Sequence, residues 1–266
     1  MKILVLGATG SIGRLVVGEA LKAGHDVHAL VRQPARARVL PEGVTLHIGD
    51  VTDPASLKPA VAGVDGVICT LGSDGMGKLG AETVDYGGIR NLLAAIETGR
   101  PHITLMTAIG VTNREGAYNR QTQSHDWKRR AERLVRASGL PYTIVRPGWF
   151  DYNGADEMLP VFLQGDRRHA GDPSDGAIAR GTLARVLVQS LGNPVACGKS
   201  FELVSAHGFE PQDLMPLFAA LDADQSGALD GVRDLDNQPL AQEPPSVREA
   251  LAAEQKRADK RRVAGN

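Results

Sequence analysis

Three glycines near the amino terminus are spaced three residues apart. They lie in the segment Gly7-Ala8-Thr9-Gly10-Ser11-Ile12-Gly13, directly after the apolar run Ile3–Leu6. In a loop between a strand and a helix, the first such glycine makes a tight turn, the second lets a pyrophosphate approach the backbone, and the third lets the helix pack on the strand. The helix N-terminus then offers unpaired N–H groups to a phosphate. We therefore expect a dinucleotide here, bound by Gly7, Thr9, Gly10, Ser11, Ile12 and Gly13.

Two arginines follow the second apolar run of the chain. Arg32 comes directly after residues 26–31, and Arg36 lies one turn further on. A site that prefers NAD carries a carboxylate at this strand end, where it accepts from the ribose 2′-OH; here Asp26 lies at the opposite end of the run. A guanidinium suits the 2′-phosphate of NADP and stacks on adenine. The sequence thus predicts NADP(H), and the alternative is that both arginines are solvated surface residues.

The positions after the third and fourth apolar runs are expected to complete the cofactor site. Asp50 is placed to accept from the adenine amino group, with Val51 against the ring. The alternative role, a helix cap, fits Asp53 better. Leu71 and Gly72 follow the fourth run, where a glycine lets the backbone approach the ribose and the pyrophosphate.

The elements that must position these residues alternate between short apolar runs and helical patterns, which is typical of βαβ units in a parallel sheet. The expected strands are residues 2–7, 26–31, 44–48, 65–70, 102–107, 142–146 and 200–204, and the expected helices are residues 11–23, 81–98, 124–138, 178–191 and 211–220. We expect an α/β fold, a Rossmann-type doubly wound parallel sheet, over residues 1–220, with a small substrate-covering region from about residue 149, which begins as a loop-rich stretch over 149–175. Residues 221–266 are expected to form an acidic loop and a charged C-terminal tail.

Composition narrows the class of protein. The 266 residues carry a formal net charge of −1, which argues against a general nucleic-acid binder. The two cysteines are too few for a disulfide framework and indicate a reducing compartment. No apolar run approaches the ~20 residues that span a bilayer, and the N-terminus does not read as a signal peptide. We expect a cytoplasmic monomer or homodimer that acts on a small molecule, without nucleic acid, membrane or metal.

Together these motifs resemble a known group of proteins. The segments that carry the resemblance are Val5–Gly13, Val31-Arg32, Gly49-Asp50-Val51, Tyr142-Thr143-Ile144-Val145-Arg146-Pro147-Gly148 and Ile178–Ala184. They are similar to the atypical short-chain dehydrogenases/reductases, in particular the NmrA-like and biliverdin/flavin-reductase-like NAD(P)-binding group. The resemblance covers about residues 1–205 and implies a Rossmann fold with a bound dinucleotide, to which Pro147 would also contribute.

The positions that carry catalysis in the resembled family differ here. Tyrosine-dependent members end the fifth strand with serine and supply a Tyr-x-x-x-Lys helix. In this sequence Thr107 stands in for that serine and would hold the reacting oxygen, and Lys128 stands at the lysine position, where it would bind the nicotinamide ribose. The tyrosine position is Ser124, whose hydroxyl is a far poorer acid than a phenol.

The proton donor is therefore open among three sources. His125 can donate as an imidazolium near neutrality, Tyr118 can swing in from an upstream loop, or the proton comes from water. The alternative for both side chains is a surface position without a role.

An aromatic cluster follows the sixth strand. Trp149, Phe150 and Tyr152 hold a large share of the few aromatic residues, and in the resembled family this loop forms a substrate wall. We expect them, with Ile109, to contact the substrate; the alternative is a packed connector. We expect Arg146 to be structural.

One acidic segment imitates the start of a calcium loop. Asp222, Asp224 and Ser226-Gly227 match its first positions, but the twelfth, where a glutamate closes such a site, is Arg233. We therefore expect an acidic surface loop and no metal.

The sequence favours an NADPH-dependent reductase that transfers a hydride to a small organic acceptor. The alternatives are a non-catalytic NADP(H)-binding redox sensor of the NmrA type and an enzyme like the sugar-nucleotide epimerases and dehydratases, which normally use the tyrosine as base. A pure sensor has little need of Thr107 and Lys128, which tips the expectation toward an enzyme.

Overall fold

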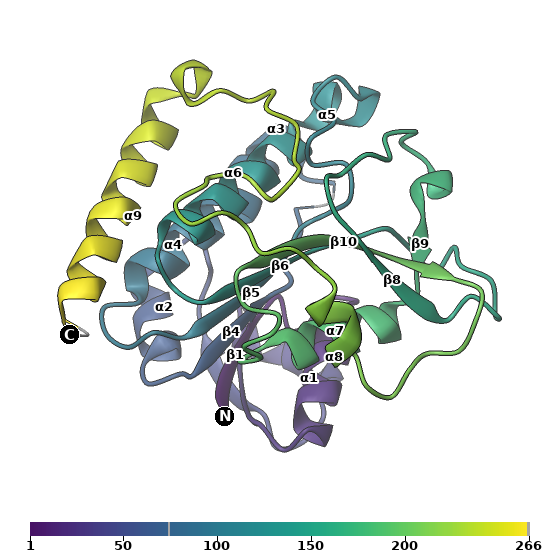
Figure 1. The fold of residues 1–266 in the computed structure, drawn as a ribbon. Coiled ribbons are helices and arrows are strands. Elements are labelled where there is room, and N and C mark those ends of the chain that lie inside the picture. The colour runs from purple at the N-terminus through teal and green to yellow at the C-terminus, as the bar shows by residue number, and fades with distance from the viewer. Residues whose placement is uncertain (74, 265–266) are drawn as a thin grey trace.

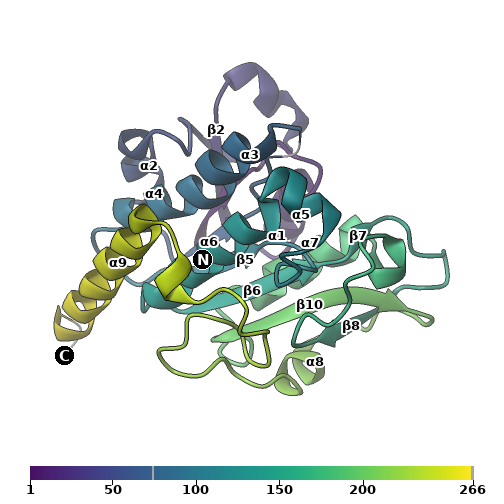
Figure 2. The ribbon, with the colours of Figure 1, turned by 90° about the horizontal axis from the view of Figure 1, so that it is seen from above.

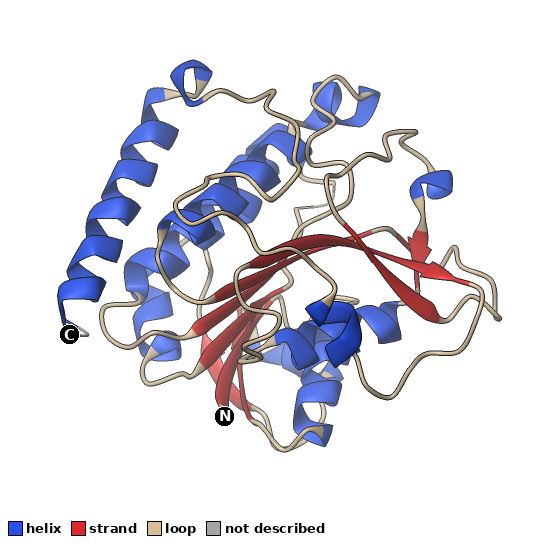
Figure 3. Ribbon diagram, viewed as in Figure 1, coloured by secondary structure: helices blue, strands red, loops and turns tan. Residues whose placement is uncertain are grey.

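The computed structural model describes residues 1–73 and 75–264. Its main sheet has eight strands in the order β3-β2-β1-β4-β5-β6-β10-β8 (Figures 1 and 3). All neighbouring strands are parallel except β8, which runs antiparallel to β10. The strands are β1 (Lys2–Leu6), β2 (Asp26–Val31), β3 (Thr45–Ile48), β4 (Gly66–Cys69), β5 (His102–Met106), β6 (Tyr142–Pro147), β8 (Leu159–Leu163) and β10 (Lys199–Ala206). The predicted α/β class, a Rossmann-type doubly wound sheet, is confirmed.

Alternation along β1 explains why helices cover both faces. Leu4 and Leu6 point into one apolar cluster, while Ile3 and Val5 point into the other, and all four are fully buried. A strand whose two faces are both buried reads as a continuous apolar run, as this one does.

The helices form a layer on each face of the sheet (Figure 1). One layer holds α1 (Gly13–Lys22), α7 (Arg180–Ser190) and α8 (Met215–Ala219). The other holds α2 (Pro54–Val61), α4 (Gly87–Ala95), α6 (Ser124–Ala137) and α9 (Pro245–Ala264). Short 3-10 helices cover Pro34–Val39, Pro173–Asp175 and Leu240–Gln242. Among the described residues, no helix is both long enough and apolar enough to cross a bilayer.

The helix expected over residues 81–98 is not uniform. It begins as α3 (Gly77–Gly80), passes through a π-helical turn at Ala81–Tyr86, and continues as α4. Such turns are rare in proteins, and those that occur often lie at functional sites. A further helix, α5 (Ala117–Thr122), precedes α6, and Gln123 joins the two in a left-handed conformation.

The loop-rich stretch expected over residues 149–175 contains two strands. β7 (Trp149–Phe150) pairs with β9 (Ala177–Ile178), and β8 forms the edge of the main sheet. Pro160 within Leu-Pro-Val-Phe-Leu argues against a central strand, but an edge strand tolerates proline because one side of it needs no ladder bond.

The chain after α8 returns to the core. Residues 222–243, which we call the C-terminal strap, run over the β6–β10 side of the molecule (Figure 2). The strap leads into α9, where Val247 and Leu251 are buried in the cluster that contains α4 and α6. The last two residues of the predicted tail lie outside the described residues.

Both cysteines are free. Cys69 is buried in β4, and burial raises the pKa of its thiol to about 12, whereas Cys197 is half-buried.

Candidate functional site

A cavity of about 260 Å³ opens at the carboxyl ends of β1, β2 and β4. Ligands of open α/β sheets bind at these strand ends. The predicted cofactor residues that line it are Gly7, Thr9, Gly10, Arg32, Arg36, Asp50, Val51, Leu71 and Gly72. Predicted residues that do not line it are Ser11, Ile12, Gly13, Lys128 and Pro147. Six further residues line the cavity that the sequence analysis does not assign to the cofactor, and most of them flank the predicted ones. They are Leu30, Val31, Gly49, Thr70, Met76 and Val84.

The backbone of the glycine-rich loop packs so closely on itself and on the residue after β4 that two of its glycines have no room for a side chain. Gly7 has a φ of +80°, and a Cβ there would lie 2.6 Å from the Thr70 carbonyl oxygen. A Cβ on Gly13 would lie 2.1 Å from the Gly7 carbonyl oxygen. Ile12, at the start of α1, gives no side-chain cap. The amides of Arg14 and Leu15 donate to the Gly10 and Ile12 carbonyls at 3.1 and 2.9 Å, whereas the Gly13 amide has no backbone partner among the described residues and is left for a phosphate.

The charged residues of the cavity are two arginines and one aspartate. Arg32 and Arg36 are exposed, and within the described part of the chain neither forms an ion pair. Asp50 accepts two bonds on Oδ1, from the Thr52 amide at 2.9 Å and its hydroxyl at 2.8 Å. Its Oδ2 is left to accept from an adenine amino group. The capping role belongs to Asp53, which accepts from the Ala55 amide at 3.0 Å.

Lys128 is paired with a buried carboxylate that the sequence analysis missed. Its Nζ lies 3.2 Å from Oδ2 of Asp85, and Ser73 donates its hydroxyl to the same oxygen at 2.6 Å. Asp85 lies in the π-helical turn, its side chain is 2% exposed, and its Oδ1 has no hydrogen-bond partner among the described residues. Because Ser73 follows the cavity-lining Leu71 and Gly72, this triad connects the cofactor cavity to α6. No sequence signal near Lys128 points to Asp85, which is 43 residues away.

Thr107 is bonded to a second buried carboxylate on α6. Its hydroxyl donates to Oε1 of Glu132 at 2.7 Å, and Arg146 donates to both oxygens of Glu132 at 3.0 and 2.6 Å. Burial opposes ionisation of Glu132, but Arg146 and Arg136 hold its pKa below the usual value. The Thr107 proton is therefore committed to Glu132, so in this arrangement the hydroxyl can accept a further hydrogen bond but does not donate to a reacting oxygen, which is the role that the sequence predicts for it. Arg146 is fully enclosed, as expected of a structural residue.

The candidate proton donors lie together at the start of α6. The rings of Tyr118 and His125 are 5.3 Å apart, and Ser124 is buried beside them. Desolvation lowers the pKa of His125, and its Nδ1 is buried without a hydrogen-bond partner. A histidine with a lowered pKa is mostly neutral at pH 7, which disfavours an imidazolium donor. Tyr118 is half-exposed.

The predicted substrate residues divide between two places. Trp149 and Tyr152 are exposed and pack edge-to-face at 6.1 Å, next to Phe150, over whose ring the Arg180 guanidinium lies at 5.1 Å. Ile109 is buried in the loop after β5, and its amide donates to the carbonyl oxygen of Pro147, two residues before Trp149, at 3.0 Å.

The loop that carries Ile109 is fixed by Asp166. This fully buried carboxylate accepts from the amides of Gly110 and Thr112 at 2.6 and 2.7 Å. Burial opposes its ionisation, but His169, Arg146 and these amides lower the pKa of Asp166 to about 2.

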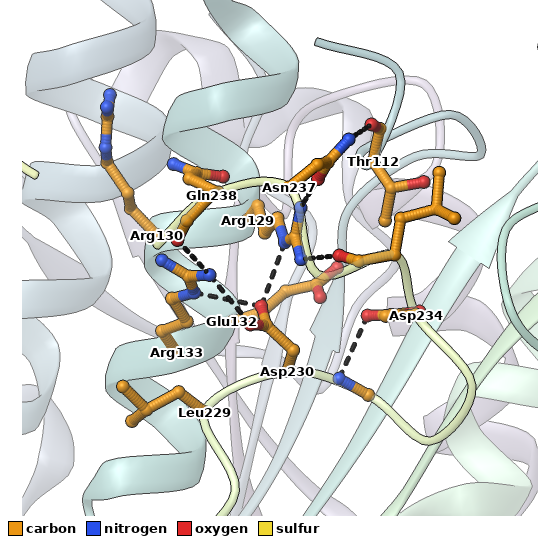
Figure 4. Close-up of polar contacts among 12 residues, drawn as sticks. Thr112, Arg129, Arg130, Glu132, Arg133, Leu229, Asp230, Asp234, Asn237 and Gln238 are labelled. Carbon is orange, nitrogen blue, oxygen red and sulfur yellow. Dashed lines mark hydrogen bonds and ion pairs between the residues drawn. The ribbon is translucent and has the colours of Figure 1, made fainter. Parts of the chain in front are cut away.

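The C-terminal strap contacts α6 through the arginines of that helix (Figure 4). Arg129 and Arg133 both donate to Asp230, and Arg130 and Arg133 both donate to Glu243. The acidic residues of the strap are therefore largely engaged by arginines rather than solvated. Within the described residues, no group of three His, Cys, Asp or Glu side chains is arranged to hold a metal ion.

Residues 7–194 match the sequence profile of a family described as NAD(P)H-binding. The chain belongs to this NAD(P)H-binding family. The expected resemblance and cofactor class are thereby confirmed at the level of NAD(P)-binding Rossmann proteins.

Curated relatives of this NAD(P)H-binding chain include plant and algal proteins. It is 32% identical to photosystem II assembly factor Ycf39 of Cyanophora paradoxa, over 82% of this chain and 67% of that protein. It is 30% identical to isoflavone reductase homolog A622 of Nicotiana tabacum, over 80% and 64%. It is 28% identical to sanguinarine reductase of Eschscholzia californica, over 77% and 89%. The chain thus spans about two thirds of the length of the first two relatives.

Solved structures share the fold of this family member. A putative NAD-dependent epimerase/dehydratase from Bacillus halodurans has a TM-score of 0.67 at 22% identity, over 78% of this chain and 95% of that one. A short-chain dehydrogenase/reductase from Veillonella parvula, in complex with NADP, has a TM-score of 0.58 at 18% identity, over 80% and 99%.

Proposed function

We propose that this protein is an NADPH-dependent reductase acting on a small organic acceptor. The observation that carries the proposal is the glycine-lined cavity in which Arg32 and Arg36 supply positive charge without an ion-pair partner among the described residues. A 2′-phosphate neutralises both guanidiniums, whereas a 2′-hydroxyl leaves them unpaired. Reductases among the relatives support the same class of activity.

The residues around Lys128 have distinct tasks in this proposal. NADPH supplies the hydride when bound. Asp85 holds the Lys128 ammonium in place, and Lys128 orients the nicotinamide ribose. Thr107 can accept a hydrogen bond from an N–H or O–H group of the acceptor, such as a flavin N–H, but while its own proton is committed to Glu132 it does not donate to a carbonyl oxygen. Trp149 and Tyr152 provide an apolar wall for the acceptor.

The proton comes from water or from Tyr118 in this scheme. Burial keeps His125 neutral near pH 7, so it has no proton to spare as an imidazolium. Acceptors whose reduced form takes its proton from water, such as flavins and quinones, place the least demand on the site.

The test combines calorimetric binding of NADPH and NADH with NADPH consumption against quinones, flavins, aldehydes and imines. We expect tight NADPH binding, and turnover of one acceptor class that falls sharply in Lys128→Ala. Weak binding of NADPH, or tighter binding of NADH, would overturn the cofactor part.

A redox sensor of the NmrA type is the second candidate. The position of the catalytic tyrosine is a buried serine, Ser124, which favours a protein that binds the dinucleotide without chemistry. Tight NADPH binding without turnover of any acceptor would support this function instead. We also propose that the protein is cytoplasmic and that it is a monomer or a homodimer. Light scattering of the purified chain tests its oligomeric state.

A further inference from the structure

A second cavity, of about 390 Å³, lies on the strap side of the sheet edge and shares no lining residue with the cofactor cavity. Its walls come from β8 and the turn after it, from β10, and from the start and middle of the chain between α8 and α9. The volume falls in the range of small-molecule sites, roughly 300–1,000 Å³. Ile109, which the sequence predicts to contact the substrate, lines this cavity, whereas the proposed function places the acceptor against Trp149 and Tyr152.

Half of the residues that line this cavity are apolar. Phe162 and Leu163 of β8, Leu221 and Ile109 face it, and the last two are 8% exposed. Phe162 is also stacked on Phe201 at 4.4 Å, which fixes its ring. A flat apolar group can therefore bury against a rigid wall.

The rim of the cavity carries positive charge that the protein does not neutralise. Arg167 and Arg168 are exposed, and neither forms an ion pair with a described residue. Both donate to backbone carbonyl oxygens, Arg167 to that of Arg233 at 3.5 Å and Arg168 to that of Asp175 at 3.2 Å. Arg129, Arg133 and Arg146 elsewhere are each paired with carboxylates. Two guanidiniums beside an apolar wall therefore suit an anionic group.

One acidic side chain also lines the cavity, and its environment limits repulsion of an anion. Oε2 of Glu202 accepts from the Asp166 amide at 3.1 Å, and Oε1 accepts from Arg146 at 3.3 Å. Burial raises the pKa of Glu202 to about 7. The carboxyl group is thus partly neutral near physiological pH, and Arg146 offsets its ionised form.

We propose that this second cavity binds a small organic anion with a flat apolar body, at a site separate from that of the cofactor. The apolar part packs against Phe162 and Leu221, and the anionic group receives hydrogen bonds from Arg167 and Arg168. Binding at this site does not depend on the proposed reductase activity.

The test uses two fluorescent probes that differ mainly in charge. The anion is 8-anilinonaphthalene-1-sulfonate, and its neutral counterpart is N-phenyl-1-naphthylamine. Each is titrated into the full chain saturated with NADPH, so that the cofactor cavity is closed to both. We expect the anion to bind about tenfold more tightly than the neutral probe, and to lose that advantage in the double variant Arg167→Ala/Arg168→Ala.

The control variant is Arg248→Ala, which removes an exposed arginine of α9 that does not line the cavity. Its affinity for the anion should equal that of the unchanged protein. Three results would each overturn the proposal: no binding of the anion to the NADPH-saturated protein, equal affinities for the two probes, or an unchanged anion affinity in the double variant. Melting curves verify that both variants are folded.

Discussion

The ammonium of Lys128 lies 3.2 Å from Oδ2 of Asp85, although α6 and the π-helical turn are far apart in the sequence. Ser73 donates to the same oxygen and follows the residues that line the cofactor cavity. Cofactor binding and the position of Lys128 are therefore connected through one carboxylate.

This connection predicts non-additive effects on cofactor affinity. Asp85→Asn and Lys128→Met should each weaken NADPH binding, and the double variant should bind no more weakly than the worse single variant, because either change breaks the same contact. Calorimetric titration measures all three. Asp230→Asn, which breaks ion pairs to Arg129 and Arg133 of α6 without touching Lys128, is the matched control and should leave the affinity unchanged. Additive losses would mean that Asp85 and Lys128 act separately.

The cavity arginines predict the choice of cofactor. Arg32→Ala/Arg36→Ala should lower the affinity for NADPH about tenfold or more and leave the affinity for NADH nearly unchanged, because only NADPH carries the 2′-phosphate. Arg38→Ala is the control, because Arg38 lies in the same 3-10 helix as Arg36 but does not line the cavity. Equal losses for both cofactors would contradict an assignment of these arginines to the 2′-phosphate.

Two glycines of the same helix should respond oppositely to alanine. In Gly13→Ala the new methyl group would collide with the Gly7 carbonyl oxygen, so we expect loss of stability and of NADPH binding. A Cβ on Gly18 meets nothing within 4 Å, and alanine there should stabilise α1 by about 0.5–1 kcal/mol. Thermal melting with and without NADPH compares the pair; similar behaviour of both variants would argue against the close approach.

The ion pairs of the strap should differ in how much they contribute to the free energy of unfolding, according to whether they are buried or exposed. Asp234 is 1% exposed and pairs with Arg146, so Asp234→Asn should cost ~3 kcal/mol of the free energy of unfolding. Asp222 is half-exposed and pairs with Arg233, so Asp222→Asn should cost at most ~1 kcal/mol. Urea unfolding measures both, and equal costs would show that the strap contact is loose.

Glu202 predicts a pH dependence of stability. Its folded pKa is raised to about 7 from 4.5, so the folded state holds a proton that the unfolded state releases. The contribution of Glu202 to the free energy of unfolding is at its maximum below pH 4.5. It falls by roughly 3 kcal/mol in all as the pH rises to 7. Glu202→Gln removes this dependence, so the variant should gain stability relative to the unchanged protein between pH 5 and pH 8. A constant difference over that range would refute the raised pKa.

The sequence was sufficient for the features that depend on local pattern. The strands β1, β2 and β4, the glycine loop and the cavity-lining Arg32 and Asp50 follow from apolar runs and from residues directly after them. What it missed are contacts between distant segments. Asp85 and Glu132 contact Lys128 and Thr107 only after folding. The edge strand β8 was not predicted, because its proline argues against a strand. The acidic residues of the strap were interpreted as solvated because their arginine partners lie about a hundred residues earlier.

That separation has a consequence for how the molecule assembles. Arg129 and Asp230 are 101 residues apart, and Arg130 and Glu243 are 113 apart. On a ribosome, α6 therefore emerges with a row of uncompensated guanidiniums long before the acids that neutralise them are made. Contacts of such long range close slowly. We expect the nascent Rossmann core to form first, with α6 incompletely packed until the strap binds to it. Docking of the strap should then be the last and slowest step of folding.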